Sequence, residues 1–556
     1  MRKLKHTPPL LALLVFGSGA IAQGAAPSEA QDLQGRQPPR PLRSDQSALP
    51  PPPAAAASAP GGEGSGPTLQ LETLELRGNL AIPSDELLAA LGDWKGRRYT
   101  LAQLRALTDT LMGHYRRRGY PFVQVYVPPQ SSSAGALVVQ IVEGRFGQVL
   151  AVGTDDAADA QGAQPFLDHG LRRGEVIRDA DLERTLLILD DQPARKVRPV
   201  LRPGGERGEG DLLVEIRRTD TVSGELGLDN AGNRNTGSTR ATANLRINSP
   251  WRYGDKLSFS ALYTDRRMGL GSAEYETPLG PSGLRGMLGM ARTSYQLGGE
   301  FAELDAAGYA RVATARLSYP VLRSQASNLL ATLSLQHKRM EDRLRAVEVV
   351  HEKSSRLLVA GLQFDRRDAL GGGGVTYGLL SLTAGRLNLD AGSLATDALT
   401  ARTQGGFQKL NLDIARIQKL GGPFTLYGRL SAQWAAQNLD ASEKFGAGGS
   451  YGVRAYPMGE GSGDAGWLAQ LELRMEAGPT TPFLFVDGAR TRANVESWDA
   501  GSAARRALAG AGLGLRASLE RWTLEATLAA RLRGGTSTAE RPDRNPRLFL
   551  RADYRF

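Results

Sequence analysis

An alternation of apolar and polar side chains runs through residues 467–475, WLAQLELRM, with Gln470, Glu472 and Arg474 between the apolar positions. Because successive side chains of a β-strand point to opposite faces, this segment has one apolar and one polar face. Strands that cross an outer membrane have this pattern, with lipid on one side and a wet lumen on the other. The segment therefore predicts a transmembrane β-strand.

The same alternation recurs from Val222 to the end of the chain. Residues 522–531, WTLEATLAAR, are a clear second example. About sixteen such segments can be placed, an even number within the range of bacterial single-chain barrels. A soluble β-sandwich, the alternative, would rarely need so long a series of strands. Residues 219–556 are therefore predicted to form an all-β transmembrane barrel of about 16 antiparallel strands.

The connections between these segments differ in length, as an outer-membrane barrel requires. Short turns, expected in the periplasm, are predicted at residues 248–255 and 278–283. Longer connections, expected outside the cell, are predicted at residues 295–306, 341–352 and 387–401.

The first 22 residues are typical of a secretory signal peptide. Basic residues precede a short apolar core, residues 10–16, and Ala20-Ile21-Ala22 is a small-x-small cleavage site. The core is too short to span a bilayer as a helix, and no later apolar run is long enough. Any membrane insertion must therefore use strands. A soluble periplasmic protein is the alternative reading of this terminus.

Residues 23–67 are rich in proline, alanine and glycine, which predicts a flexible or partly polyproline linker. Within the linker, residues 28–35, SEAQDLQG, either form a short helix that plugs the pore or are disordered.

The composition excludes several classes of protein. The 556 residues contain no cysteine, so disulfides, thiolate metal sites and cysteine nucleophiles are excluded. The net charge of +10 does not indicate nucleic acid binding, because the arginines are spread along the chain. The histidine and acidic spacings match no metal site, so neither a metal nor another cofactor is expected.

Between linker and barrel, the order strand, helix, helix, strand, strand occurs twice. In residues 68–144, Thr100 and Gln103 form a capping box at the start of the second helix. In residues 145–218, helices are predicted at 165–171 and 179–189. The sequence therefore predicts two tandem α+β modules.

Short sequence motifs in these modules resemble those of a known family. They are Tyr115 before Gly119-Tyr120, then Glu143-Gly144, Asp191-Gln192-Pro193 and Leu201-Arg202-Pro203-Gly204. With the element order, they resemble the paired POTRA domains of two-partner secretion transporters. These are the TpsB-type outer-membrane transporters of the hemolysin activator/secretion protein family, within the POTRA-barrel superfamily.

The resemblance implies that residues 68–144 and 145–218 are two periplasmic POTRA domains that precede a barrel in the bacterial outer membrane. It also implies a partner, a large secreted exoprotein such as an adhesin- or hemolysin-like β-helix. In the family the POTRA domains capture the secretion domain of this passenger, partly as a strand added to a sheet edge.

A glycine-rich segment, residues 445–467, lies in the long connection 438–466 and has the freedom to fold back on itself. It contains Val453-Arg454-Ala455-Tyr456, where family members carry V-R-G-Y or V-R-G-F after the eleventh strand. In Phe485-Val486-Asp487-Gly488, the phenylalanine and the aspartate match the family's F-x-D-x-G on the thirteenth strand, with Gly488 at the second variable position. The resemblance implies that this loop enters the lumen and that Arg454 pairs with Asp487 on the inner wall.

The residues around this pair support the pairing physically. In a regular strand Phe483 and Phe485 share the face of Asp487 and restrict water there, which strengthens an Arg–carboxylate contact. A solvated loop arginine is the alternative for Arg454. Ala455 and Ala489 replace family glycines. If position 455 needs a positive φ, alanine costs roughly 1 kcal/mol; otherwise Gly452 and Gly459 supply the flexibility.

Two enzyme patterns in the loop fail on context. Residues 448–452 match G-x-S-x-G, but every histidine precedes Ser450 and no strand-to-helix turn is predicted. Residues 461–466 match G-x-G-x-x-G, but a strand follows instead of a phosphate-binding helix. No catalytic residue and no enzyme activity are predicted.

The last segment alternates up to Tyr554 and the terminal Phe556. This ending resembles the signal by which the barrel-assembly machinery recognises outer-membrane barrels for insertion into lipid.

The leading hypothesis is an outer-membrane pore that recognises the secretion domain of an exoprotein in the periplasm and passes it, unfolded, to the cell surface. An insertase that assembles other outer-membrane proteins is the first alternative. A passive porin is the second, but it leaves residues 68–218 unexplained.

Overall fold

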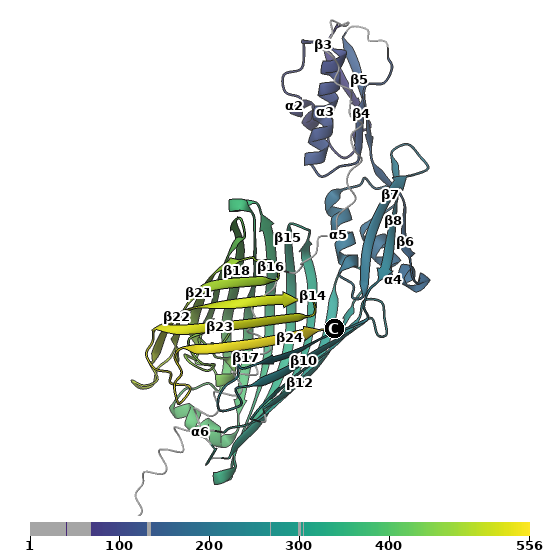
Figure 1. The fold of residues 1–556 in the computed structure, drawn as a ribbon. Coiled ribbons are helices and arrows are strands. Elements are labelled where there is room, and N and C mark those ends of the chain that lie inside the picture. The colour runs from purple at the N-terminus through teal and green to yellow at the C-terminus, as the bar shows by residue number, and fades with distance from the viewer. Residues whose placement is uncertain (1–40, 42–67, 131–134, 267, 299–301, 304) are drawn as a thin grey trace, which may run out of the picture.

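The computed structural model describes residues 41, 68–130, 135–266, 268–298, 302–303 and 305–556. The predicted signal peptide, the possible plug helix at 28–35 and all of the linker except Pro41 lie outside the described residues. Two small α+β modules extend in line from one end of a large β-barrel (Figure 1). Among the described residues, no helix combines the length and apolar character needed to cross a membrane.

The first module has the predicted order of elements. They are β1 (Thr68–Gln70), β2 (Thr73–Arg77), α2 (Ser84–Ala90), β3 (Arg98–Thr100), α3 (Leu101–Arg117), β4 (Val123–Tyr126) and β5 (Ala136–Glu143). The strand expected at 69–76 is two strands, because β1 pairs with β3 whereas β2 pairs in parallel with β5. The capping box of Thr100 and Gln103 is present, and α3 buries Leu104, Leu111 and Tyr115 against the sheet.

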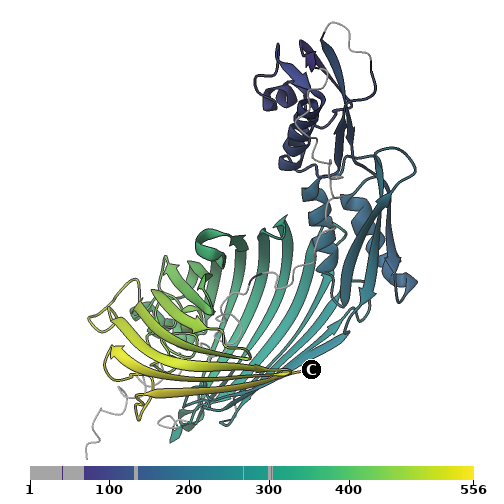
Figure 2. The ribbon, with the colours of Figure 1, turned by 45° about the horizontal axis from the view of Figure 1, so that its top comes forward.

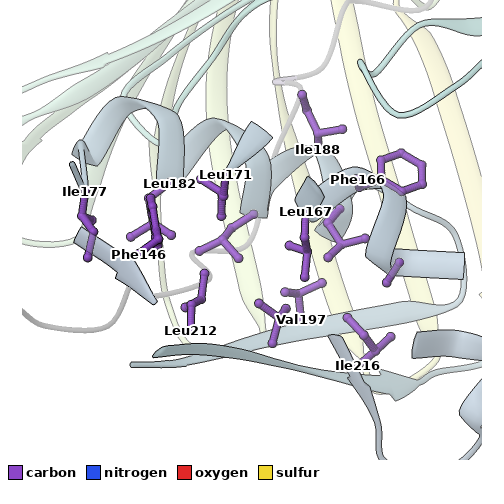
Figure 3. Close-up of a cluster of buried hydrophobic side chains, with 14 residues drawn as sticks. Phe146, Phe166, Leu167, Leu171, Ile177, Leu182, Ile188, Val197, Leu212 and Ile216 are labelled. Atoms are coloured by element: carbon purple, nitrogen blue, oxygen red, sulfur yellow. The ribbon is translucent and has the colours of Figure 1, made fainter. Parts of the chain in front are cut away.

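The second module repeats this plan around a parallel β6–β8 pair. Its elements are β6 (Arg145–Gly153), α4 (Ala157–Gly170), α5 (Asp179–Asp190), β7 (Arg195–Pro203) and β8 (Glu209–Arg218). The first helix begins before the predicted residue 165 because Asp156 caps it by accepting from the Ala158 amide at 2.9 Å. Leu167 and Leu212 are fully buried between the helices and the sheet (Figure 3). Leu189 of α5 is fully buried in the same cluster.

Sixteen antiparallel strands close the barrel, which confirms the predicted number. They are β9 (Val222–Asp229), β10 (Arg240–Asn248), β11 (Lys256–Thr264), β12 (Gly269–Pro278), β13 (Arg285–Gln296), β14 (Ala306–Arg323), β15 (Ser327–Leu344), β16 (Val349–Asp368), β17 (Gly374–Leu389), β18 (Gly405–Gly421), β19 (Phe424–Ala435), β20 (Ala465–Met475), β21 (Thr480–Arg492), β22 (Arg505–Leu519), β23 (Trp522–Arg533) and β24 (Arg547–Arg555). The seam between β24 and β9 has five residue pairs, whereas β15 and β16 share eighteen.

The two faces of the wall differ as the alternation predicts. On β20 the outward residues Trp467, Leu471 and Leu473 are exposed, whereas Gln470 and Glu472 point inward and are buried. The prediction of a long connection at residues 341–352 is wrong. Strands β15 and β16 continue through most of it and are joined by the short turn η2 (Arg345–Val347). The connection after β17 contains helix α6 (Ala391–Leu399).

The second module is attached to the barrel at its periplasmic rim (Figure 2). Arg323, the last residue of β14, donates two hydrogen bonds to Asp191, of 2.7 and 2.6 Å. Arg184 of α5 donates to the Pro320 carbonyl at 2.8 Å. Tyr253, in the turn before β11, lies 6.0 Å from Phe166 of α4, ring centre to ring centre. Three contacts on two sides therefore fix the direction of the module.

Candidate functional site: a loop held inside the barrel

The connection between β19 and β20, residues 436–464, folds back into the lumen. Phe445 and Gly463 exchange backbone hydrogen bonds of 2.7 and 2.8 Å at its base. Further in, the Val453 amide donates to the Ala447 carbonyl at 2.7 Å. Gly452 is required here, because a Cβ would lie 2.3 Å from the Ala447 carbonyl oxygen. The loop is therefore a compact structure with its own hydrogen bonds.

The inward end of this loop brings Arg454 against Asp487 of β21. The Arg454 Nε and Nη2 donate to the two carboxylate oxygens at 2.9 and 2.7 Å, and the Arg454 backbone amide donates at 3.1 Å. Both residues are buried, Asp487 completely. Three charge-assisted bonds to one carboxylate fix the guanidinium and the backbone beside it in one orientation.

A second carboxylate, not predicted as a partner, shares the same arginine. Glu472 of β20 accepts from Arg454 Nη1 at 2.6 Å. Its other oxygen accepts from Arg474 at 2.6 Å and from Arg516 at 3.3 Å, and Arg516 also binds Glu525 at 2.8 Å. The three arginines and three carboxylates balance in charge. The sequence placed Glu472 on the inner face, but only the strand register puts it opposite Phe485 and beside Asp487.

Aromatic rings cover this charged cluster as predicted. The guanidinium carbon of Arg454 lies 3.5 Å from the centre of the Phe485 ring, and that of Arg516 lies 4.2 Å from the Phe483 ring. Both phenylalanines are buried on the face of β21 that carries Asp487. Cation–π contact and exclusion of water strengthen the ion pairs beneath the rings.

The alanine at position 455 introduces no backbone strain. Ala455 lies outside the left-handed region, whereas Gly449, Gly459 and Gly461 have φ values of +104°, +87° and +66°. Ala455 is fully buried against Gly510 of β22, where a Cβ would lie 2.6 Å from the Ala455 methyl group. The loop therefore takes its conformational freedom from neighbouring glycines, and the wall glycine makes room for the methyl group.

Tyr456 and Glu460 attach the loop to the connection between β23 and β24. The Tyr456 hydroxyl is a hydrogen-bond donor to the loop's neighbours: its oxygen lies 2.9 Å from the Arg533 carbonyl oxygen and 3.0 Å from the Gly535 carbonyl oxygen. The Glu460 carboxylate accepts from the Ser537 hydroxyl at 2.8 Å and from the Thr538 amide at 2.7 Å, and Arg506 also contacts it. Glu460 is fully buried and was not predicted from the sequence.

The opposite side of the loop binds lysines on the far wall. Glu443 contacts Lys338 of β15 at 2.6 Å and Lys409 of β18 at 2.8 Å. Asp440 contacts Lys353 of β16 at 2.9 Å. The loop therefore crosses the lumen, with arginines of the wall on one side and lysines on the other.

The residues of the rejected enzyme patterns have structural positions. Ser450 lies in a turn of the loop, and Asp464, within the glycine pattern, accepts from Lys444 at 2.5 Å. Among the described residues, no three histidine, aspartate or glutamate side chains are grouped so that they could hold a metal ion.

The C-terminal residues complete the seam. Tyr554 pairs with Leu226 on β9, and Phe556 exchanges backbone hydrogen bonds with Gly224 at 3.0 and 3.1 Å. Their rings stack at 6.5 Å on the outer face, where Phe556 is half exposed.

Comparison with known families matches two parts of the chain. Residues 208–517 match the family described as "Haemolysin secretion/activation protein ShlB/FhaC/HecB". Residues 69–144 match the POTRA domain of ShlB type. The chain is 26% identical over 411 residues to the heme/hemopexin transporter protein HuxB of Haemophilus influenzae, covering 73% of this chain and 72% of HuxB.

The structure is similar to that of CdiB from Escherichia coli, with a TM-score of 0.72 and 20% identity over the full length of both chains. A second similar structure, CdiB from Acinetobacter baumannii, has a TM-score of 0.63 and 18% identity, again over both full chains. The barrel, the POTRA domain and the family match agree. The chain belongs to the haemolysin secretion/activation protein family and is a two-partner secretion transporter of the bacterial outer membrane, with its POTRA domains in the periplasm.

Proposed function

We propose that the chain passes a large exoprotein, unfolded, through its barrel, and that loop 436–464 is the internal element that prepares the pore for transport. The observation that supports this role is the buried contact of Arg454 with both Asp487 and Glu472. An arginine that only stabilised a surface loop would need neither a second carboxylate nor a stacked ring. The cluster instead holds one defined loop position inside the path of the passenger.

The POTRA domains offer the passenger free sheet edges. The strand orders β2-β5-β4 and β6-β8-β7 place β4 and β7 at one edge of each sheet and β2 and β6 at the other. An extended segment can add to such an edge through backbone hydrogen bonds, which fits an unfolded secretion domain. A β-helical passenger, adhesin- or hemolysin-like, fits this mode because its strands form only after export.

Two further partners belong to this proposal. The exposed aliphatic side chains of the outer face fit membrane lipid, and the terminal aromatic pair Tyr554 and Phe556 fits recognition by the barrel-assembly machinery. The insertase alternative has no specific support, since the relative matched over most of its length is named a transporter.

Export of the partner exoprotein by cells carrying Arg454→Ala tests this role. We expect export to be lost while the barrel remains in the membrane, because the variant removes the contacts that fix the loop. Arg366→Ala is the matched control, since Arg366 is an exposed arginine of β16 on the outer face. Heat-modifiable electrophoretic mobility reports the folded barrel. Unimpaired export by the Arg454 variant would contradict the proposal.

A further inference from the structure

Five arginines lie on the outer face of the barrel near its extracellular end. The face is defined by β15, where Lys338 reaches Glu443 in the lumen, so that the neighbouring odd-numbered residues point outward. Arg292, Arg311 and Arg339 are direct cross-strand partners on β13, β14 and β15. We call these three the first arginine row.

A second row continues on the next strands. His337 of β15 is the direct partner of Arg356 on β16, and Arg356 is the partner of Arg386 on β17. The rows are joined on β15, where Arg339 Nε donates to His337 Nε2 at 3.1 Å. All five arginines are exposed. The strands are antiparallel, and Arg323 at the end of β14 marks the periplasmic rim through its contact with Asp191. Arg311 and Arg339 lie toward the opposite ends of β14 and β15, so both rows belong to the outer leaflet of the membrane.

Within the described part of the chain, none of these five arginines forms a salt bridge. Arg292 and Arg311 lie 5.8 and 5.0 Å from the centre of the Tyr309 ring. Arg311 also feels the charge of Glu341, but that carboxylate is already bound by Arg343 and Tyr309. Like charges directly opposite each other on neighbouring strands are destabilising. A row of three arginines is therefore an unfavourable arrangement in the isolated protein, and an external anion would relieve it.

An apolar groove lies directly below the arginine rows. It has a volume of about 1240 Å³ and is lined by outward side chains that include Leu288, Met290, Leu335 and Leu358, with Arg356 and Arg386 at its extracellular margin. A second hollow of about 570 Å³ adjoins it and is bordered by the whole first row. The aliphatic groove matches the acyl chains of an amphiphile, and the cationic margin matches its anionic head group. The amphiphile that fits both carries several acyl chains.

One polar atom at this margin lacks a partner. The Nδ1 atom of His337 is buried and makes no hydrogen bond in the described structure, although Nε2 of the same ring is engaged by Arg339. A ligand head group that reaches this margin would supply the missing partner.

We propose that this surface is a binding site for a phosphorylated, multiply acylated glycolipid of the outer leaflet, of the lipid A type. Arginine forms bidentate bonds with phosphate, and several arginines in a row fit a head group with more than one phosphate. The groove takes the acyl chains. The position at the extracellular end selects a lipid of the outer leaflet over a phospholipid of the inner leaflet.

Native mass spectrometry of the full-length protein in detergent, titrated with diphosphoryl lipid A, tests the site. The variant is Arg292→Gln/Arg311→Gln/Arg339→Gln, and Arg366→Gln on the same outer face but at the periplasmic end is the control. We expect about tenfold weaker binding for the triple variant and none of this loss for the control. Monophosphoryl lipid A and phosphatidylglycerol are the comparison lipids, and both are expected to bind more weakly to the unmodified protein.

A melting experiment gives a second readout that does not depend on the triple variant. Arg311→Gln removes the central charge of the first row, so the barrel in lipid-free detergent should melt at the same or a higher temperature. Added diphosphoryl lipid A should stabilise this variant less than the unmodified barrel. Equal lipid A binding by the triple variant, or equal affinity for phosphatidylglycerol, would overturn the proposal.

Discussion

The barrel carries two groups of arginines on opposite faces of its wall, and they differ in what they contact. Arg454, Arg474 and Arg516 in the lumen each bind a carboxylate of the same chain. The arginine rows of the outer face bind none within the described residues. The lumenal group is therefore complete in itself and holds an internal loop, whereas the outer group is incomplete until an anion arrives.

This difference separates two uses of one residue type. Buried ion pairs contribute to a defined conformation, and removing one partner is costly because the other remains buried and charged. Exposed, unpaired arginines contribute little to folding and are available for recognition. The following predictions test this contrast, beginning with the largest expected effect.

Asp487→Ala should destabilise the barrel most, by about 3–5 kcal/mol, because Arg454 would lose the partner that accepts three of its hydrogen bonds. Urea unfolding in detergent, followed by electrophoretic mobility, measures this loss. Glu496→Ala, at an exposed carboxylate, is the control and should change little. If Asp487→Ala lost no more free energy of unfolding than the control, the lumenal ion pairs would not stabilise the barrel.

Asp159 of the second POTRA domain provides a paired case outside the membrane. Burial acts to raise the pKa of Asp159, but hydrogen bonds from Arg195 and Arg218 outweigh it and hold that pKa below the ordinary 3.8. The folded state therefore gains stability from the charged form above the unfolded pKa and loses it as the pH falls through the folded pKa. Asp159→Asn should cost about 2 kcal/mol at neutral pH.

Hydrogen exchange of residues 157–170 in the full-length protein measures this effect. In the unmodified chain, the protection of these amides from exchange should decrease as the pH falls below about 4. Asp159→Asn should remove that part of the pH dependence. Unchanged protection in the variant at neutral pH would refute the role of the pair.

Ala313→Glu would place a carboxylate within the outer group, since Ala313 lies beside Arg311 and opposite His337. We expect the lipid-free barrel to gain about 0.5 kcal/mol through attraction of the new carboxylate to its diagonal cross-strand neighbours Arg292 and Arg339, and its binding of diphosphoryl lipid A to weaken. Ala313→Gln, which has the same shape without the charge, is the control. Undiminished lipid binding by the glutamate variant would contradict the idea that the outer group is incomplete.

Ala455→Gly should have the smallest effect. Since Ala455 has no positive φ and packs its methyl group on Gly510, glycine should destabilise the barrel by about 1 kcal/mol or less. The same urea unfolding measures it. A gain in stability would show instead that alanine strains this turn.

The sequence predicts most of the fold because the main signals are local. The alternation of residues 467–475 and the capping box at Thr100 depend on neighbours in the chain, and both features are present in the structure. The strand at 69–76 and the connection at 341–352 were predicted wrongly, because the partner of a strand decides where it breaks or continues. Leu71 lies at the break between β1 and β2 and is buried in the core of the first module.

Less of the site could be predicted from the sequence, because most of its contacts join residues that are distant in the chain. The Arg454–Asp487 contact was expected only through the family motifs. Glu472 of β20 binds the loop, and Glu460 and Glu443 of the loop bind the β23–β24 connection and the wall lysines. Their roles depend on strand register and on the return path of the loop. The outer arginine rows are likewise invisible in the sequence, because their members are separated by hairpins and meet only across strands.

Unequal strand lengths give the barrel a sloping rim. β9, β10 and β24 have 8 or 9 residues, close to the length that spans the hydrocarbon core, whereas β15 and β16 have 18 and 20. The tall β15–β16 hairpin stands on the side where Glu443 and Asp440 of the loop meet the wall lysines. An exported chain is therefore bounded by long strands on one side of the barrel and by the short strands β9–β12 on the other. We expect it to emerge in one direction, over the short strands.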